Sequence, residues 1–441
     1  MKELNSPLAH WNQLTAPIYA NKKRYFAIIL FGFLVQMIVG FIFYRHTVLL
    51  SDSSNYLNVA RNIAAGRGFT DHFPEMNPLV LHQSAWRPPL YPLVLSVALF
   101  AFGPHIIVAQ ILNASIGIVD IILVDITVRE VISSHFSKDQ DIKLSSYAGL
   151  VASFLLATYP PFLSNTLVPL TEPLEILLIL CTALWLAKSR YLLASLSAGL
   201  LILTKPGAEV FALISCILIF KFWGYRSALK SLAVVVLIIF PWLVRNYVVM
   251  GAPVVETSDG FNLASEYSQY SQQTKGFVDP VFDPQFKSYW PLEDNEVKWD
   301  RALASMGLEN IKRHPIVVFD VFKRNVETMF QFRPVMSNPP EVSDLRDLAF
   351  VNNSRPWIYF ISAIGLYCSL YFVRNRLMIT LFALVGWDSL SGLFSTGAPR
   401  LRSSFDVFSC IGFGLGYYLF RKSMQKRVES KGISDQLLSL Y

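Results

Sequence analysis

The first long apolar segment decides the class of this chain. Residues 22–60 read KKRYFAIILFGFLVQMIVGFIFYRHTVLLSDSSNYLNVA. The run from Tyr25 to Tyr44 has about the 20 apolar residues that a helix needs to cross a bilayer core. It is longer than the apolar part of a cleavable signal peptide, so we interpret it as a first membrane helix. The basic cluster at residues 22–24 predicts that the N-terminus lies in the cytoplasm.

The composition excludes several classes of protein. Of 441 residues, 53% are hydrophobic and 16% are charged, whereas soluble domains carry about 25% charge. The net charge of +7 is first a topology signal in a membrane protein, so no nucleic-acid partner is expected. Long apolar runs exclude a disordered chain. The four cysteines are far apart in apolar runs, which is typical of core residues and not of a metal or redox motif.

The apolar runs predict an all-α polytopic membrane protein with about ten transmembrane helices and both termini in the cytoplasm. We expect interfacial helices in the first external loop and a small external helical cap. The expected organisation is a cytoplasmic N-terminus (1–24), a transmembrane core (25–250) with the first external loop (45–104), an external cap (251–355), C-terminal transmembrane helices (356–420) and a cytoplasmic tail (421–441). The expected spans are 25–44, 105–128, 144–160, 172–187, 191–204, 207–220, 229–249, 357–373, 377–395 and 404–420.

Asp52 is the first candidate for chemistry. It follows the first predicted helix at the external interface, among hydroxyl-bearing neighbours. A carboxylate in this place could accept a proton from an acceptor alcohol. The alternative is that Asp52 caps the next helix, which would stabilise that helix by about 1 kcal/mol.

Five cations form a second group, because the predicted topology places all of them at the external membrane boundary. Arginine binds phosphate oxygens through two parallel hydrogen bonds, so such a group suits a lipid phosphate or pyrophosphate. The alternative for each residue is an ordinary contact with lipid headgroups near a helix end. The five residues are Arg87, Lys205, Arg245, Arg400 and Arg402.

Six further residues are candidates for binding the acceptor or lining the pocket. Glu172 is at an external helix start, where helix capping explains a carboxylate equally well. His82 belongs to no metal-binding motif, so no built-in metal site is predicted, and a divalent cation held together with a substrate phosphate is left open. The six candidates are Tyr56, His82, Tyr91, Glu172, Glu266 and Tyr267.

Three further acidic residues, Asp120, Asp125 and Asp388, lie within predicted spans. They are either structural or evidence for a transporter.

An ordered series of motifs resembles the GT-C superfamily of polytopic glycosyltransferases, within it the branch of protein O-mannosyltransferases and the lipid A aminoarabinose transferase. The series covers most of the chain. It comprises Ser51-Asp52-Ser53-Ser54-Asn55-Tyr56, Gly66-Arg67-Gly68-Phe69, Trp86-Arg87-Pro88-Pro89-Leu90-Tyr91-Pro92, Thr171-Glu172-Pro173-Leu174, Thr204-Lys205-Pro206, Pro241-Trp242-Leu243-Val244-Arg245-Asn246-Tyr247 and Arg400-Leu401-Arg402.

The resemblance implies a sugar donor linked to polyprenyl phosphate and an acceptor reached from the external side. It implies that Asp52 is the base and that Arg87, Lys205 and Arg245 contact the phosphate of the sugar donor. We therefore expect an inverting hexosyl- or pentosyltransferase in a bacterial plasma (inner) membrane, with a lipid, glycan or protein as acceptor. The alternatives are a polytopic transporter or lipid flippase, and a polymerase or ligase of lipid-linked glycans.

Overall fold

The computed structural model describes residues 22–44, 48–72, 81–136, 141–292, 295–332 and 352–430. Helices make up almost all of its regular structure. The membrane-type helices are α2 (Lys22–Val39) with its π-helical continuation η2 (Gly40–Tyr44), α5 (Ile106–Phe136), α6 (Ile142–Ala157), α7 (Pro160–Thr166), α8 (Glu172–Ala187), α9 (Tyr191–Ile202), α10 (Glu209–Trp223), α11 (Tyr225–Met250), α17 (Arg355–Tyr371), α18 (Arg376–Phe394) and α19 (Ser403–Ser430).

Each of the ten predicted spans coincides with one of these helices. Among the described residues, four helices are long and apolar enough to cross a membrane, namely α2 with η2, α5, α11 and α18. A fifth span results if α6 and α7, which meet at 64°, are counted together. A membrane protein with several spans is therefore confirmed. The number of ten crossings and the division into five regions stay predictions.

The segment predicted as the first external loop contains α3 (Ser51–Ala64), β1 (Thr70–Asp71), β2 (His82–Gln83) and α4 (Leu90–Phe102). The strands pair antiparallel. Helix α3 is amphipathic and α4 is a short apolar helix that exposes Val97, Phe100 and Phe102. Two helices are thus present in this loop, as expected from the sequence, and their position at the membrane interface stays a prediction. The predicted loop also includes residues 73–80, which lie outside the described part of the chain.

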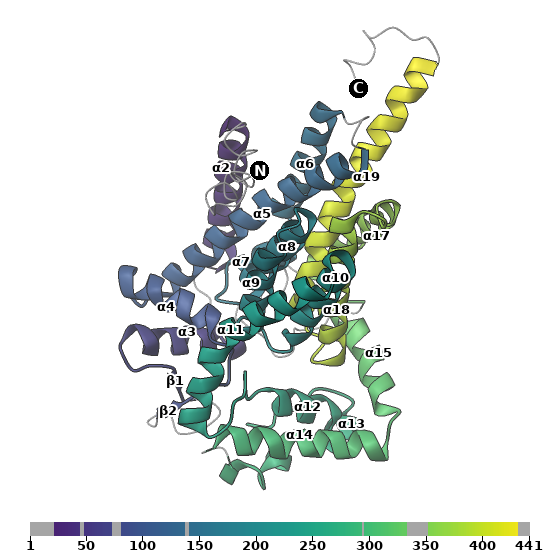
Figure 1. The fold of residues 1–441 in the computed structure, drawn as a ribbon. Coiled ribbons are helices and arrows are strands. Elements are labelled where there is room, and N and C mark those ends of the chain that lie inside the picture. The colour runs from purple at the N-terminus through teal and green to yellow at the C-terminus, as the bar shows by residue number, and fades with distance from the viewer. Residues whose placement is uncertain are drawn as a thin grey trace.

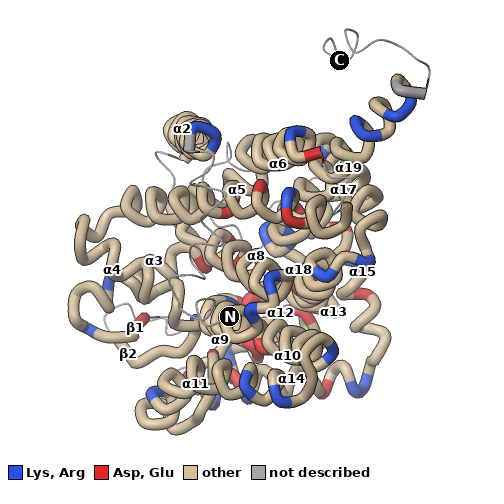
Figure 2. The backbone as a smooth tube through the Cα atoms, turned by 45° about the horizontal axis from the view of Figure 1, so that its top comes forward, with Lys and Arg blue, Asp and Glu red and all other residues tan. Residues whose placement is uncertain are grey.

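The cap follows α11 and lies at one end of the helical bundle. It consists of α12 (Asp259–Tyr267), α13 (Gln269–Thr274), the 3-10 turns η3 (Pro284–Phe286) and η4 (Trp290–Leu292), α14 (Glu296–Arg313) and α15 (Val317–Met329). The start of α2 and the end of α19 lie at the opposite end of the molecule (Figure 1). Along the bundle, charged residues occur at only a few points of the backbone (Figure 2), as the low charge content requires.

Close packing in the bundle depends on small residues, as is common between membrane helices. A Cβ atom added at Gly365 of α17 would come within 2.1 Å of the Ser409 backbone oxygen on α19. A Cβ atom at Gly412 would come within 2.0 Å of the Gly365 backbone oxygen. The two helices approach this closely only because both positions are glycine. The cysteines are free thiols, with Cys410 buried and the others half-buried, in agreement with core positions.

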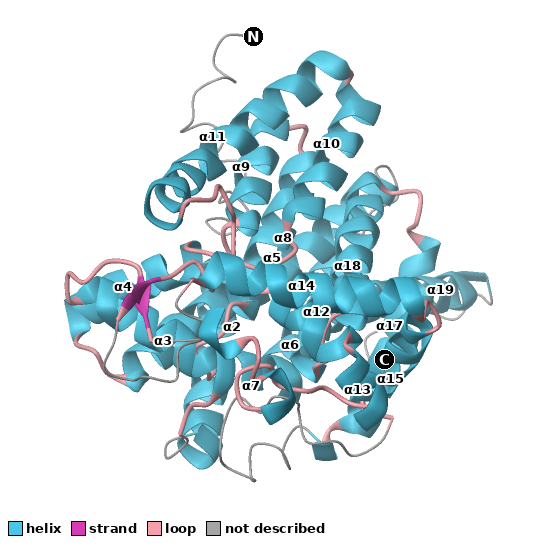
Figure 3. Cartoon of the chain, turned by 90° about the horizontal axis from the view of Figure 1, so that it is seen from below, coloured by secondary structure: helices cyan, strands magenta, loops and turns pink. Residues whose placement is uncertain are grey.

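The first external loop and the cap share one small core. The Trp86 indole, from the loop, is 5.3 Å from the Phe261 ring of α12 and 5.7 Å from the Trp299 ring of α14. Val281 and Leu303 pack in the same cluster. Seen from the cap side, α12 and α14 lie in front of the bundle (Figure 3). The cap is therefore anchored on residues 81–87, close to Arg87.

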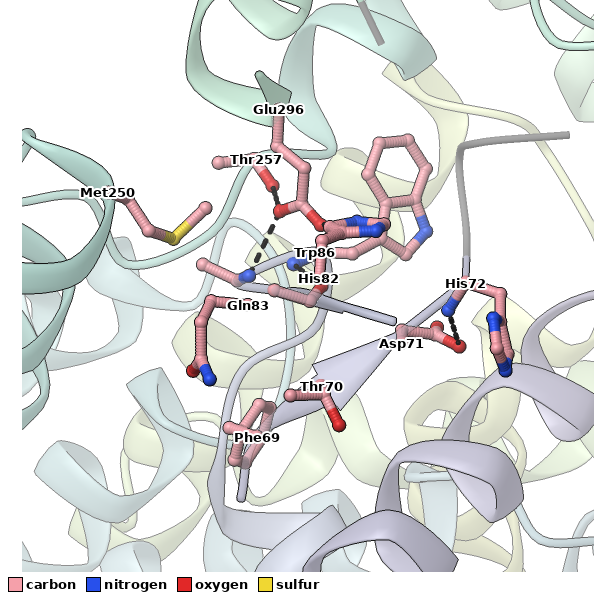
Figure 4. A network of polar contacts seen from close by, with 12 residues as sticks. Phe69, Thr70, Asp71, His72, His82, Gln83, Trp86, Met250, Thr257 and Glu296 are labelled. Atoms are coloured by element: carbon pink, nitrogen blue, oxygen red, sulfur yellow. Dashed lines mark hydrogen bonds and ion pairs between the residues drawn. The ribbon is translucent and has the colours of Figure 1, made fainter. Parts of the chain in front are cut away.

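Glu296 is the main polar link between these two parts (Figure 4). Its carboxylate accepts hydrogen bonds from the Ala85 backbone N–H at 2.9 Å and from the Thr257 hydroxyl at 2.7 Å, and it lies 3.1 Å from His82 Nε2. The Thr257 N–H also donates to the Ala85 backbone oxygen at 3.0 Å. His82, a pocket candidate from the sequence, thus lies at the junction and not in the cavity described below.

We expect Glu296→Ala to lower the free energy of unfolding by about 2–4 kcal/mol, because it leaves buried donors of the first loop and of Thr257 without an acceptor. Thermal unfolding followed by tryptophan fluorescence in detergent micelles would measure this. The matched control is Glu309→Ala, which removes an exposed carboxylate from the same helix and should change stability by no more than about 0.5 kcal/mol. Equal stability of the two variants would show that the junction does not depend on Glu296.

Candidate active site

A cavity of about 990 Å³ lies between the predicted first external loop, the cap and the adjoining ends of the bundle helices. The bundle contributes the α9–α10 turn, the end of α18 and the turn η5 (Pro399–Arg402). The cavity is therefore built from segments that are far apart in the sequence. Its charged and polar lining includes Asp52, Asn55, Asn58, Asp71, His72, Arg87, Lys205, Asp259, Asp279 and Arg400, and its apolar lining includes Tyr56, Trp86, Phe261, Tyr267, Phe277, Phe282 and Leu308.

Asp52 lies at the centre of the charged lining. It is in the first turn of α3, but the helix cap is Leu50 and no side chain caps the helix. The capping interpretation of Asp52 is therefore wrong. Instead, one carboxylate oxygen forms an ion pair with Arg87 and the other with Arg400. Burial raises the pKa of Asp52, but the two guanidinium groups outweigh burial and hold its pKa below the usual value.

Arg87 is held in place by contacts other than Asp52. Its Nε donates to Asn55 Oδ1 at 3.2 Å, and the Asn55 amide in turn donates to Asp71. The guanidinium carbon lies 5.4 Å from the centre of the Tyr56 ring, within the range of a cation–π contact. The Arg87 side chain is 11% exposed, at the surface of the cavity. Its guanidinium is thus oriented before any ligand binds.

Arg400 reaches the same point from the other end of the chain. It belongs to η5, which follows the left-handed residue Gly397 (φ 60°). Its Nη1 donates to Glu172 Oε1 at 2.6 Å, while Nη2 contacts Asp52. Glu172 is only 1% exposed and comes from the first turn of α8. Two arginines and two carboxylates therefore form one charge-balanced group beside the cavity.

Lys205 also lines the cavity, at the turn after α9. Its ammonium group donates to Glu175 Oε1 at 2.7 Å and to Asp388 Oδ1 at 2.6 Å. Both carboxylates are fully buried, and Asp388 also accepts from the Ser404 hydroxyl. Asp388, considered structural or transporter-like from the sequence, is thus part of an ion-paired network. Glu175 drew no attention in the sequence, because it lies in an apolar run and its partner Lys205 is 30 residues away.

The structure does not bring two of the predicted phosphate-binding arginines into the cavity. Arg245 donates to the backbone oxygens of Ser84 (2.8 Å) and Phe69 (3.0 Å) and stacks on Trp242, so it supports the first external loop. Arg402 is fully buried and contacts Asp406 and the Met329 backbone oxygen. Both belong to the scaffold around the site.

The predicted acceptor residues divide in the same way. Tyr56 and Tyr267 line the cavity, and the Tyr267 hydroxyl donates to the Phe394 backbone oxygen at 2.7 Å. Tyr91 is buried behind Tyr56, with the two rings 5.3 Å apart at 90°. Glu172 forms an ion pair with Arg400, and Arg400 lines the cavity. Glu266 does not line the cavity; it forms a buried ion pair with Arg324.

Glu266 makes the cap sensitive to pH. Burial raises its pKa to about 7, although Arg324 opposes the shift. The folded state then keeps a proton that the unfolded state loses above its pKa of 4.5, so stability is greatest at low pH and falls as pH rises towards 7. We expect the melting temperature of Glu266→Gln to fall less between pH 5 and pH 8 than that of the unsubstituted protein. Parallel pH profiles for the two would contradict this assignment.

Metal ligands are not assembled in the described residues. Among them, no three His, Cys, Asp or Glu side chains are placed to hold a metal ion. The cations among the described lining residues are Arg87, Arg400 and Lys205, and Lys205 is paired with two buried carboxylates.

Several lining residues were not singled out in the sequence. Asn55 and Asp71 orient Arg87, and Trp86 and Phe261 join the loop to the cap. Asn55 and Trp86 lie inside the quoted motifs, next to the candidate residues Tyr56 and Arg87. Their position beside these candidates was the one sequence signal that could have identified them. Phe261, Phe277 and Phe282 could not be distinguished from packing residues of the cap.

The chain was compared with known proteins. No protein-family profile and no curated protein matches it. Among solved structures, the oligosaccharyltransferase of Archaeoglobus fulgidus tethered with an acceptor peptide has 14% identity and a TM-score of 0.50, and the match covers 94% of this chain and 51% of that one. ArnT from Cupriavidus metallidurans bound to undecaprenyl phosphate has 11% identity and a TM-score of 0.38, and the match covers 91% of this chain and 79% of that one.

The chain thus spans about half the length of the archaeal oligosaccharyltransferase that it matches, and almost all of its own length takes part in the match. At this level of identity the match concerns the fold. Oligosaccharyltransferases are members of the superfamily that the sequence motifs resemble. The chain therefore shares the fold of the archaeal oligosaccharyltransferase over the matched part.

Proposed function

We propose that this protein is a membrane glycosyltransferase that moves a sugar from a polyprenyl-phosphate donor to an acceptor hydroxyl on the external face of the membrane. The main support is one juxtaposition: Asp52, Arg87 and Arg400 meet at a cavity beside the bundle, although they come from opposite ends of the chain. This reaction needs a carboxylate that accepts the proton of the acceptor hydroxyl. It also needs cationic groups that bind the phosphate, and two guanidinium groups can do so.

In the proposed mechanism the acceptor oxygen attacks the anomeric carbon while the bond to the phosphate oxygen breaks. Asp52 accepts the acceptor's hydroxyl proton. Arg87 and Arg400 stabilise the negative charge that grows on the leaving phosphate. A single displacement inverts the anomeric centre. Lys205 acts indirectly, since its ammonium group already has two carboxylate partners.

The cap supplies the other wall of the cavity, and we propose that it contacts the acceptor. Phe261, Tyr267 and Phe277 face the cavity from α12 and the following loop. Aromatic surfaces of this kind suit the apolar face of a sugar or a lipid stem as well as a peptide side chain. The transfer assay described below therefore compares lipid, glycan and protein acceptors. It also compares hexosyl and pentosyl donors.

The transporter alternative loses most of its support. Asp125 is paired with Arg24 and lies 3.6 Å from Arg129, and Asp388 is paired with Lys205. Of the three intramembrane acids, Asp120 alone has both carboxylate oxygens buried without a hydrogen-bond partner among the described residues. The ionisable groups that line a cavity gather at one end of the bundle, as expected for a transferase at a membrane surface.

The test is a transfer assay in lipid nanodiscs with a polyprenyl-phosphate sugar and a panel of acceptors. We expect Asp52→Asn to lower kcat by about 10²- to 10⁴-fold, the usual cost of removing a general base. The matched control is Asp300→Asn, a carboxylate of the cap that contacts the Gly260 backbone N–H away from the cavity. Turnover near that of the unsubstituted protein in Asp52→Asn would remove Asp52 from the role of base.

A further inference from the structure

The ion pairs of Asp52 pose a problem for the proposed base. A carboxylate whose two oxygens both contact guanidinium groups is stabilised in its charged form, and its affinity for a proton falls. The same two guanidinium groups are the cavity's ligands for a phosphate. Asp52 and a phosphate would therefore compete for Arg87 and Arg400.

We propose that Arg87 and Arg400 exchange Asp52 for the phosphate of the sugar donor, so that binding of the donor releases Asp52 to act as the base. This inference rests on the proposed function and adds an order to it: donor first, proton transfer afterwards. The Asp52 carboxylate contacts both guanidinium groups at the position proposed for the phosphate. The phosphodiester of the donor offers two non-bridging oxygens to the same N–H groups, one for each arginine.

The surroundings of the arginines suit such an exchange. Each guanidinium has a second partner that keeps it in place when Asp52 leaves: Asn55 for Arg87 and Glu172 for Arg400. Asn55 and Glu172 lie on different helices, α3 and α8. The exchange therefore requires only a rotation of the Asp52 side chain, which is 17% exposed towards the cavity, and no movement of a helix.

Charge balance gives the exchange a physical consequence. Arg87, Arg400, Asp52 and Glu172 together carry no net charge, and the bound phosphodiester adds one negative charge. In the transfer step the electron pair of the broken bond stays on the phosphate oxygen, so the leaving lipid phosphate gains a second negative charge. The acceptor's proton neutralises Asp52 at the same time. The group therefore keeps a net charge of −1 through the step, which avoids building up charge in a partly buried site.

The direct test is equilibrium binding of undecaprenyl phosphate to the full-length protein in nanodiscs. We expect Asp52→Asn to bind it at least about tenfold more tightly than the unsubstituted protein, because the competing carboxylate is gone. The control is Asp259→Asn, which removes a carboxylate from the same cavity without removing a partner of either arginine in the described contacts. Its dissociation constant should change by less than about threefold, the limit of a general charge effect.

The outcomes separate this inference from the proposed function. Equal or weaker binding by Asp52→Asn, with clear binding by the unsubstituted protein, would overturn the exchange and leave the donor class intact. An equal gain in affinity for Asp52→Asn and Asp259→Asn would overturn it too, since charge alone would then explain the effect. No binding by any of the three proteins would overturn the proposed function together with the exchange.

A second measurement needs no substitution. The acidic limb of the pH profile reports the free enzyme in kcat/KM and the bound complex in kcat. Asp52 faces Arg87 from the first loop and Arg400 from η5, with Tyr56 on its own helix and Glu172 on α8 nearby. If the arginines move to the phosphate, the acidic limb of kcat should lie at least about one pH unit above that of kcat/KM. Coinciding limbs would contradict the exchange.

Discussion

Arg400→Ala is expected to lower kcat/KM for transfer by about 10²- to 10³-fold, the usual cost of removing one group that stabilises a charge growing in the transition state. Arg400 contacts both Asp52 and Glu172, so its loss also leaves the Glu172 carboxylate buried without its guanidinium partner. The assay is the same transfer reaction in nanodiscs, with protein folding checked by thermal unfolding.

Two further variants sharpen this prediction. Arg400→Lys keeps the charge but loses the planar pair of hydrogen bonds, so we expect it to recover only part of the activity. Arg313→Ala removes an arginine that is 70% exposed on the outside of the cap and should leave the rate unchanged. Full activity in Arg400→Ala would show that Arg400 only supports the fold.

Lys205→Met is expected to destabilise the protein by about 3–5 kcal/mol, because it leaves Glu175 and Asp388 buried without their cation. The triple variant Lys205→Met/Glu175→Gln/Asp388→Asn removes all three charges and should recover more than half of the loss. Thermal unfolding of the two variants in the same detergent measures the difference.

This prediction also separates two roles of Lys205. The family resemblance implies that Lys205 contacts the phosphate of the sugar donor, whereas its contacts are those of a buried ion-pair network. If Lys205→Met keeps the melting temperature of the unsubstituted protein and loses binding of undecaprenyl phosphate, the phosphate role is correct and the network is dispensable. A large loss of stability that the triple variant reverses would assign Lys205 to the scaffold.

The sequence predicted a large part of the architecture because apolar run length and basic flanks are local signals. The ten predicted spans coincide with helices, and the predicted interfacial segments after Ser51 and Arg87 are α3 and α4. The segment predicted as a helical cap contains α14 and α15, from Glu296 to Met329. Run length alone did not determine which helices cross the membrane, since several, including α9, are short.

The candidate site was predicted less completely. Asp52, Arg87, Lys205 and Arg400 line one cavity, as a common location at the external boundary suggested. Arg245 and Arg402 carry the same charge and have similar positions in the topology, but they point into the scaffold. A one-dimensional topology places a residue at a depth in the membrane, and it does not specify the direction of its side chain. Glu175 escaped notice because its partners are distant in sequence.

The sequence by itself determined that this is a helical membrane protein, because hydropathy and charge act over about 20 neighbouring residues. Only the tertiary structure decided which charges pair. Asp52 and Arg400 are 348 residues apart in the sequence. Their ion pair exists only because the first turns of α3 and α8 and the turn η5 meet beside the same cavity. Ion pairs depend on distance in space and on burial, and neither quantity can be obtained from local patterns.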